Sequence, residues 1–369
     1  MVKIMKKIVD GNKACALSAY LFSEICAIYP ITPSTPMASE IDVMSHKGYK
    51  NLFNEPVKVV QMQSEAGAAG AMHGALVTGS LATTFTASQG LLLMIPNMYK
   101  MAGEMLPGVI HVAARSLATH ALSIFGDHQD IYATRAAGFC MLASASVAEA
   151  HHLAAVAHLA AIKASLPFLH FFDGFRTSHE LAKIDIIDEA ALLSLIDFEQ
   201  IKKFKDQSLN VGCGFQQGLA QNEDVYFQIT EARNQDYNQV PAIVADYMQA
   251  INKLTNQDYQ PFNYYGDPNA QAVIIAMGSV TDTIKLVVDD LNAKGQALGL
   301  VVVRLYRPFS REYLLKVLPQ TVQKIAVLDR TKEAGSAGEP LYLDVLGALK
   351  DNNLTIVGGR YGLSSKNTT

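Results

Sequence analysis

Short, uninterrupted apolar runs alternate with helix-like segments along the first half of this chain. The runs predicted as strands are Cys26–Tyr29, Val57–Met62, Ala82–Ala87, Gly108–Ala114, Phe139–Ala143 and Pro167–Phe172. The segments predicted as helices are Thr35–His46, Ser64–Gly79, Gly90–Met105, Gln129–Ala137 and Val147–Ala164. Strands that are apolar throughout, without polar alternation, are typical of a parallel sheet covered on both faces. We therefore expect an α/β fold built on a doubly wound parallel sheet.

The composition changes near residue 198, where Gln, Asn, Asp and Tyr become frequent. We interpret residues 198–242 as a polar excursion and linker, with one helical stretch near Ile243–Leu254. The alternation then restarts, with strands expected at Val273–Met277, Leu298–Arg304, Lys324–Asp329 and Leu354–Gly358 and helices at Thr281–Ala293 and Arg311–Leu318. A length of 369 residues favours two domains. We expect the first at residues 1–250 and a second, smaller α/β domain at 251–369 that ends before its fold is complete.

Composition excludes several classes of protein. The net charge of −4 and pI near 6.2 argue against a nucleic-acid-binding or anionic-membrane surface. The four cysteines are widely spaced along the chain and form no disulfide framework, which is consistent with a reducing cytoplasm. The uncharged run Ala66–Tyr99 contains glycines, Pro96 and several amide and hydroxyl side chains, so we do not interpret it as a membrane span.

Glu65 is the first candidate for a functional residue. It directly follows a predicted strand and opens a helix, where an acid can simply complement the helix dipole. However, Gly67, Gly70 and Gly74 follow on one helix face. Each glycine costs roughly 0.5–1 kcal/mol relative to Ala inside a helix. Three on one face indicate that a ligand or a neighbouring helix packs against the backbone there.

Two further candidates follow other strands. The loop Tyr29–Pro33 is stiffened by two prolines, and it presents the Thr32 hydroxyl at the carboxyl end of a strand, where ligands of doubly wound sheets bind. Arg115 ends another strand, and a guanidinium can bind a carboxylate in bidentate fashion. The structural alternatives are a plain proline-rich turn and a salt bridge from Arg115 to Glu104 or Asp127.

Histidines and acids elsewhere give weaker signals. The segment 126–130, GDHQD, is predicted to be an active-site loop that caps the following helix, because its spacing fits no standard metal site. His151 and His158 share a helix face, which we interpret as an ordinary helix surface. We expect no metal ligand in this chain.

Several long motifs resemble pyruvate:ferredoxin (flavodoxin) oxidoreductases. In the first domain these are AIYPITPSTPM, QMQSEAGAAGAMHGAL, TTFTASQGLLLMIPNMYKMAGE, LSIFGDHQDIYATR and FFDGFRTSHE. In the second domain they are VVRLYRPFS, VLDRTKE and GRYGLSSK. The resemblance covers essentially the whole chain and is looser through the polar excursion.

The resemblance implies a thiamine-diphosphate enzyme that oxidatively decarboxylates pyruvate, gives acetyl-CoA and passes electrons to ferredoxin or flavodoxin. It implies a pyrimidine-binding first domain followed by a transketolase C-terminal-like domain, in a cytoplasmic homodimer. Glu65 occupies the position of the acid that hydrogen-bonds the aminopyrimidine ring, and we expect Pro30, Ile31 and Gly67 beside the same cofactor. Thr32 and Arg115 match the positions that bind the pyruvate carboxylate.

Two family features are missing from the chain. It has no Cys-x-x-Cys run for [4Fe-4S] clusters and no Gly-Asp-Gly segment for magnesium and the diphosphate. We expect those groups in other domains or subunits of the same enzyme, so that this chain alone lacks full activity. The alternatives are a relative that acts on another 2-oxoacid and a truncated, non-catalytic interaction module of the same fold.

Overall fold

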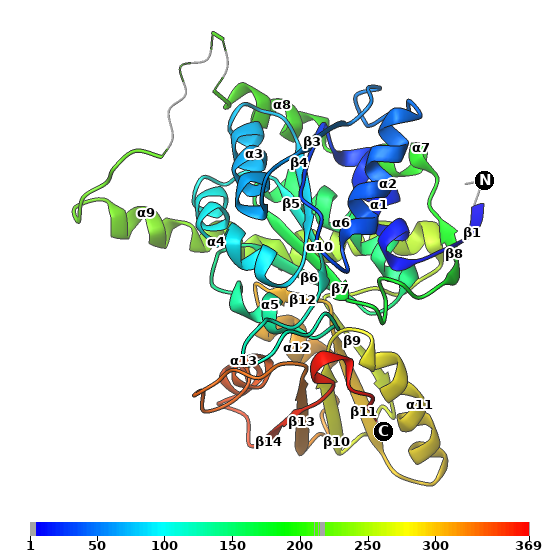
Figure 1. Cartoon of the computed structure of the whole chain (residues 1–369). Helices are drawn as coiled ribbons and strands as arrows, with labels where there is room; N and C mark the ends of the chain where they lie inside the picture. The colour runs from blue at the N-terminus through cyan, green and yellow to red at the C-terminus, as the bar shows by residue number, and fades with distance from the viewer. Residues whose placement is uncertain (1–4, 210, 213, 215–217, 369) are drawn as a thin grey trace.

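The computed structural model describes residues 5–209, 211–212, 214 and 218–368. Two sheets form its centre, one above the other in Figure 1, and the chain passes from the upper to the lower sheet after the long helix α10. A small antiparallel pair, β1 (Met5–Val9) with β8 (Ala182–Ile186), lies at the side of the upper sheet.

The upper sheet has seven strands in the order β12-β6-β7-β5-β4-β2-β3. Their bounds are β2 Ile25–Ile28, β3 Lys58–Gln61, β4 Ala82–Thr86, β5 Val109–Ala114, β6 Cys140–Ser144, β7 Phe168–Asp173 and β12 Leu305–Arg307. Only the edge strand β12 runs antiparallel to its neighbour. The doubly wound parallel α/β sheet predicted from the apolar runs is therefore confirmed.

Helices cover both faces of this sheet. On one face lie α3 (Glu65–Val77), α4 (Ser88–Gly103) and α5 (Gln129–Ala133), and on the other lie α1 (Gly11–Phe22), α2 (Thr35–His46) and α6 (Val147–Ala164). Successive residues of β5 point to opposite faces: Ile110 and Val112 join the α3–α4 core, whereas Val109 and Ala113 face α1 and α6. Burial on both faces explains why the strands are apolar throughout.

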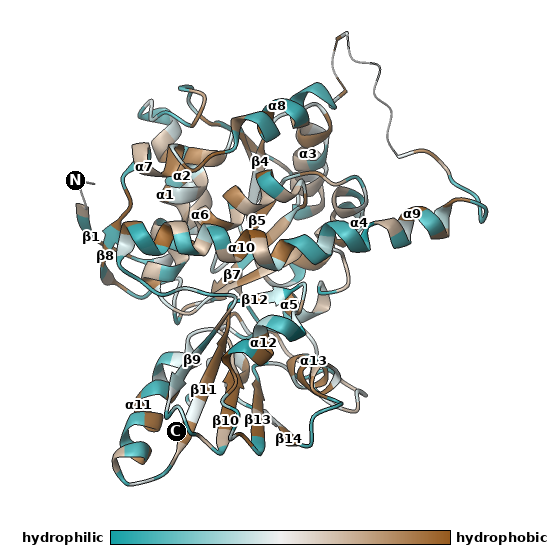
Figure 2. Ribbon diagram, turned by 180° about the vertical axis from the view of Figure 1, so that it is seen from behind, coloured by the Kyte–Doolittle hydropathy of each residue, from teal (hydrophilic) through white to brown (hydrophobic). Residues whose placement is uncertain are grey.

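The lower sheet has five strands in the order β14-β13-β10-β11-β9, with β9 antiparallel. The strands are β9 Phe262–Gly266, β10 Ala272–Ala276, β11 Leu298–Val303, β13 Lys324–Asp329 and β14 Thr355–Arg360, and the helices are α11 Val280–Ala293, α12 Arg311–Val317 and α13 Pro340–Ala348. Figure 2 shows these strands as mostly hydrophobic and α11 as mixed. Strand β12 follows β11 of the lower sheet directly, but it pairs with β6 of the upper sheet. The chain therefore crosses from one sheet to the other between β11 and β12.

The polar excursion is more helical than its composition indicates. It contains α8 (Phe198–Asp206), α9 (Tyr226–Ala232) and the start of α10 (Asn234–Thr255). Val240, Val244, Met248 and Ile251 of α10 are fully buried against the α6 side of the sheet, on an otherwise polar helix. The helical stretch predicted near Ile243–Leu254 lies inside this amphipathic helix, whose earlier turns the frequent Gln and Asn residues obscured.

The prediction that His151 and His158 lie on a helix surface is wrong. Both are almost fully buried, because α10 and α1 pack over α6. His151 accepts the backbone N–H of Ile187 and lies 2.8 Å from the Ser18 hydroxyl. Burial lowers the pKa of each imidazole to about 3, so both rings are neutral members of the core.

None of the helices in the part of the chain that the structure describes combines the length and apolar character needed to cross a membrane.

The Asp173 carboxylate, at the end of β7, joins the two sheets. It is fully buried, accepts a hydrogen bond from His128 Nε2 at 2.5 Å and from the Ser279 backbone N–H at 2.7 Å, and pairs with Arg330 Nη1 at 2.9 Å. Its pKa lies well below its ordinary value: burial opposes this shift, but the charges of Arg330 and His128 outweigh it. Three segments distant in sequence therefore converge on one anion.

We predict that Asp173→Asn lowers the free energy of unfolding by about 3–5 kcal/mol, because it leaves the buried Arg330 without a counter-charge. The difference should be full above pH ~4, the pKa of an unfolded aspartate, and should shrink at lower pH as the wild-type unfolded state takes up a proton. Denaturant unfolding at several pH values measures it. Asp289→Asn, on the exposed face of α11, is the control. Equal stability of both variants at pH 7 would contradict the role given to Asp173.

Candidate functional site

The predicted site residues meet at one edge of the seven-stranded sheet. Thr32 lies in the loop after β2, Glu65 comes shortly after β3, and Arg115 directly follows β5. Because β2, β3 and β5 are parallel, their carboxyl ends lie at the same edge, which is the usual ligand-binding edge of such sheets.

Glu65 is the first residue of α3 and is only 8% exposed. The preceding Ser64 caps the helix by accepting the backbone N–H of Gly67, so the Glu65 carboxylate is not needed as a cap. Among the residues that the structure describes, none donates a hydrogen bond to this carboxylate. Because no described group bonds to it, the carboxylate is free to accept a hydrogen bond from a ligand that brings its own donor.

The close approach of α4 to Glu65 depends on Gly90. A Cβ at this position would lie 2.7 Å from both Cγ and Oε1 of Glu65 and 2.6 Å from Oγ1 of Thr86. The Thr86 hydroxyl is itself buried and has no hydrogen-bond partner among the described residues. Sequence reasoning missed both residues, since a glycine inside a helix and a threonine in a strand carry no local signal of such a contact.

Arg115 and Thr32 are in direct contact. Arg115 Nη1 donates to the Thr32 carbonyl at 2.8 Å, and Nε donates to the Ser123 carbonyl at 3.3 Å. Neither of the proposed salt bridges to Glu104 or Asp127 forms. Arg115 is 8% exposed, and burial lowers its pKa while Asp130 raises it in part. Within the described chain its guanidinium has no ion-paired carboxylate, so a buried positive charge remains available at this edge.

Asp130 holds the backbone of the site in place. Its Oδ2 accepts the backbone N–H of Ser88 at 2.7 Å and that of Arg115 at 3.0 Å, which ties the ends of β4 and β5 together. Full burial raises its pKa to about 7, partly offset by those two bonds. The GDHQD loop was expected at the site, but its role here is to fix two strand ends rather than to cap a helix alone.

The other residues predicted to contact the cofactor or substrate differ in their exposure. Pro30 and Thr32 are exposed and Ile31 is half-buried, all on the loop beside Arg115. Gly67 packs against Gln63, four residues earlier in the chain: a Cβ on Gly67 would lie 2.8 Å from the Gln63 side chain. Gly70 and Gly74 have no described atom within 4 Å of where their Cβ would lie. Of the three glycines on this face of α3, Gly70 and Gly74 are thus open with respect to the described residues.

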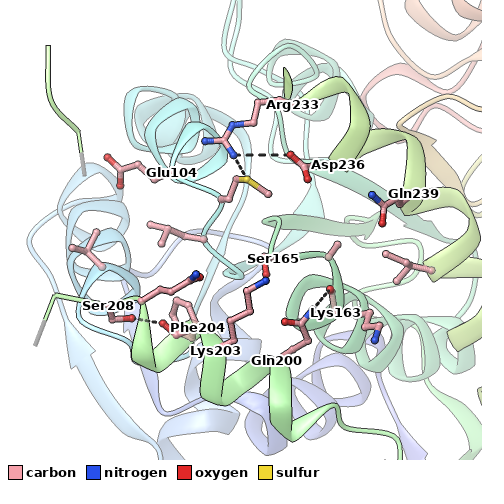
Figure 3. Close-up of a pocket in the computed structure, with 16 residues that line it drawn as sticks. Glu104, Lys163, Ser165, Gln200, Lys203, Phe204, Ser208, Arg233, Asp236 and Gln239 are labelled. Carbon is pink, nitrogen blue, oxygen red and sulfur yellow. Dashed lines mark hydrogen bonds and ion pairs between the residues drawn. The ribbon is translucent and has the colours of Figure 1, made fainter. Parts of the chain in front are cut away.

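A cavity of about 460 Å³ lies at the opposite, amino-terminal edge of the sheet. Figure 3 shows its mixed lining, in which Arg233 and Asp236 face Lys163 and Gln200 across the opening. The helices α4 and α6 end at this cavity. None of the predicted site residues Thr32, Glu65 and Arg115 lines this cavity, so the carboxyl edge of the sheet remains the candidate site.

Comparison with known families identifies the chain. Residues 18–249 match the family described as pyruvate flavodoxin/ferredoxin oxidoreductase, thiamine diphosphate-binding. Residues 270–367 match the pyruvate:ferredoxin oxidoreductase core domain II. The chain belongs to the pyruvate flavodoxin/ferredoxin oxidoreductase family.

Curated members of this family are similar over nearly the whole chain. The pyruvate:ferredoxin oxidoreductase of Moorella thermoacetica is 57% identical over 363 residues, and the pyruvate-flavodoxin oxidoreductase of Enterobacter agglomerans is 55% identical over 362 residues. Both alignments cover 98% of this chain and 31% of the relative. The chain therefore spans about a third of the length of the relatives it matches.

Solved structures show the same fold at low sequence identity. The 2-oxoglutarate:ferredoxin oxidoreductase of Magnetococcus marinus superposes with a TM-score of 0.70 at 16% identity, over 97% of this chain and 63% of that one. A split-gene transketolase superposes with a TM-score of 0.54 at 10% identity, over 95% of this chain and 89% of that one. The α/β architecture of this family member is thus shared with both.

We predict that Gly90→Ala lowers the free energy of unfolding by about 1–3 kcal/mol, because the added methyl must displace Glu65 or Thr86. Gly103→Ala is the matched control on the same helix, since nothing described lies within 4 Å of its Cβ position. That change should be neutral or stabilising by up to ~1 kcal/mol. Urea unfolding of the two variants measures the contrast, and equal effects would show that α4 does not press on Glu65.

Proposed function

We propose that this chain supplies the aminopyrimidine and substrate-carboxylate contacts of an enzyme that oxidatively decarboxylates pyruvate on thiamine diphosphate. The products are acetyl-CoA, formed with coenzyme A, and electrons that pass through iron–sulfur clusters to ferredoxin or flavodoxin. Supporting this proposal, the family model is a thiamine-diphosphate-binding one, and the similar relatives are pyruvate oxidoreductases. One structural observation supports the assignment: Glu65 and Arg115 are both largely buried, neither is ion-paired with a described residue, and they occupy the same edge of the sheet.

The cofactor contact is assigned to Glu65. Thiamine diphosphate, when bound, accepts the electrons left on the substrate carbon after carbon dioxide departs. Glu65 offers an acceptor that the described chain leaves without a donor, and Gly90 leaves room for that carboxylate. The carboxylate can therefore take the hydrogen bond of a ring N–H and hold the ring in place. Pro30, Ile31 and Gly67 are proposed as further cofactor contacts.

The substrate contact is assigned to Arg115 and Thr32. Two donors of Arg115 are used by the Thr32 and Ser123 carbonyls, which fix the plane of the guanidinium. No described acceptor is bonded to its remaining terminal nitrogen, Nη2, which can face a carboxylate. The exposed Thr32 hydroxyl can donate to the same anion. A fixed fork of this kind is the geometry that carboxylate recognition requires.

We also propose how the chain divides into domains and which parts of the enzyme lie outside it. We place a pyrimidine-binding domain at residues 1–250 and a transketolase C-terminal-like domain at 251–369. Magnesium, the diphosphate anchor and the [4Fe-4S] clusters would be bound by the remaining two-thirds found in the relatives, in a cytoplasmic homodimer. On this view the chain needs those partners for full activity.

The first functional prediction concerns Glu65. We expect Glu65→Gln to lower kcat by about 10²–10⁴-fold, since the amide keeps the shape of the side chain but cannot share a proton with the ring. The assay is pyruvate oxidation by a chimera in which this chain replaces the matching 31% of the Moorella relative. Glu55→Gln, at an exposed position, is the control. Near-normal turnover of Glu65→Gln, or its unfolding, would make Glu65 a structural residue.

The second concerns Arg115. In the same chimera, Arg115→Ala should lower kcat/KM for pyruvate by about 30-fold or more, because a buried anion loses a partner worth roughly 2–5 kcal/mol. Arg115→Lys should recover only part of the loss, since an ammonium has no planar fork. Thr32→Val keeps the carbonyl that orients Arg115 and removes one donor, at roughly 1–3 kcal/mol.

Thiamine diphosphate titration separates the two possible roles of Arg115. Its affinity should be unchanged in all three variants and in the exposed control Arg311→Ala, because neither Arg115 nor Thr32 is assigned to the cofactor. If Arg115→Ala loses cofactor affinity and turnover equally, Arg115 organises the cofactor pocket instead. Substituting 2-oxoglutarate for pyruvate tests the substrate class in the same assay.

A further inference from the structure

Three potential metal ligands converge in the core, away from the site at the carboxyl edge. Cys15 comes from α1, His111 from β5 and His170 from β7, and β5 and β7 are neighbouring strands of the upper sheet. All three side chains are fully buried, and one ligand atom of each lies within 4.8 Å of the other two. His111 Nδ1 is 2.9 Å from His170 Nδ1, which in turn is 3.9 Å from Cys15 Sγ.

The outer nitrogen of each histidine ring has its own partner. His111 Nε2 lies 3.0 Å from His158 Nε2, and His170 Nε2 lies 2.8 Å from the Ser144 hydroxyl. If both Nε2 atoms carry the proton, the two Nδ1 lone pairs point at the same place and repel unless a cation lies between them. Histidine ligands of metals are held in this way by a partner on the second nitrogen. Phe85 stacks on His111 and fixes its plane.

We propose that Cys15, His111 and His170 bind one Cu(I) ion. Two nitrogens that share a metal at about 2.0 Å each lie roughly 3.3–3.5 Å apart. The two rings would therefore separate by about half an ångström, and Cys15 Sγ would move slightly inward. Binding converts the thiol to a thiolate and releases one proton to solvent, with no change of oxidation state.

Charge selects Cu(I) over a divalent ion. One thiolate and two neutral imidazoles neutralise a single positive charge, and no carboxylate belongs to the described ligand group. Zn(II) would leave a net charge of +1 in a core lined by residues such as Ala16, Ala113 and Phe172. A buried uncompensated charge is strongly unfavourable. Thiolate also prefers soft ions such as Cu(I).

The test measures copper and zinc in the full chain, purified without oxygen from cells grown with added copper. We expect about one copper per chain, and X-ray absorption should show one sulfur and two nitrogen neighbours. Cys15→Ala should reduce the Cu(I) affinity by about 100-fold or more. Ser144→Ala keeps all three ligands but removes an outer partner, and should reduce it by about 10–100-fold.

Cys26→Ala is the matched control, because Cys26 is equally buried in the same core but has no histidine in a ligand group with it. It should keep the full copper content. Three results would each overturn the proposal: a chain that takes up no copper even when refolded with Cu(I), a chain that takes up zinc in preference, or copper retained undiminished by Cys15→Ala. If no copper is taken up, His158, His111 and His170 form only a neutral chain of N–H···N hydrogen bonds.

Discussion

The buried carboxylate of Asp173 is the interaction on which the arrangement of this molecule depends. It ends a central strand of the upper sheet and binds Arg330 and Ser279 of the lower one. Gly278 lies so close that a Cβ there would be 3.0 Å from the carboxylate. A second buried pair, Glu149 with Arg304, spans the same junction. Isolated buried charges are unfavourable, so each pair forces its two sheets to stay together.

The junction also positions the candidate site. His128, bonded to Asp173, begins the short segment whose Asp130 binds the backbone of Ser88 and Arg115. The docked lower sheet therefore restrains the ends of β4 and β5 through His128 and the first turn of α5. The lower sheet supplies neither Glu65 nor Arg115, but it restrains the start of α5, whose Asp130 binds the Arg115 backbone.

Sequence patterns predict the parts of this structure that local chemistry determines. Continuous apolar runs located all six parallel strands of the upper sheet, and the helices Thr35–His46 and Val147–Ala164 have the expected bounds. The rule that ligands bind where parallel strands end brought Thr32, Glu65 and Arg115 to one edge. Long-range contacts carry no such local signal. Cys15 meets His170 across a sequence separation of 155 residues. Strand β12 joins the upper sheet, whereas the strands before and after it in sequence belong to the lower sheet.

Buried charged residues of this chain differ in whether they have a charged partner. Asp173, Glu149 and Arg330 are as buried as the site residues, yet each has a charged partner and further hydrogen bonds within the chain. Glu65 and Arg115 are each 8% exposed and have no charged partner among the described residues. Their unbonded oxygen and nitrogen atoms are therefore free to form hydrogen bonds with a ligand. That imbalance, rather than burial or pKa alone, supports the proposal that this edge of the sheet binds an external donor and an external anion.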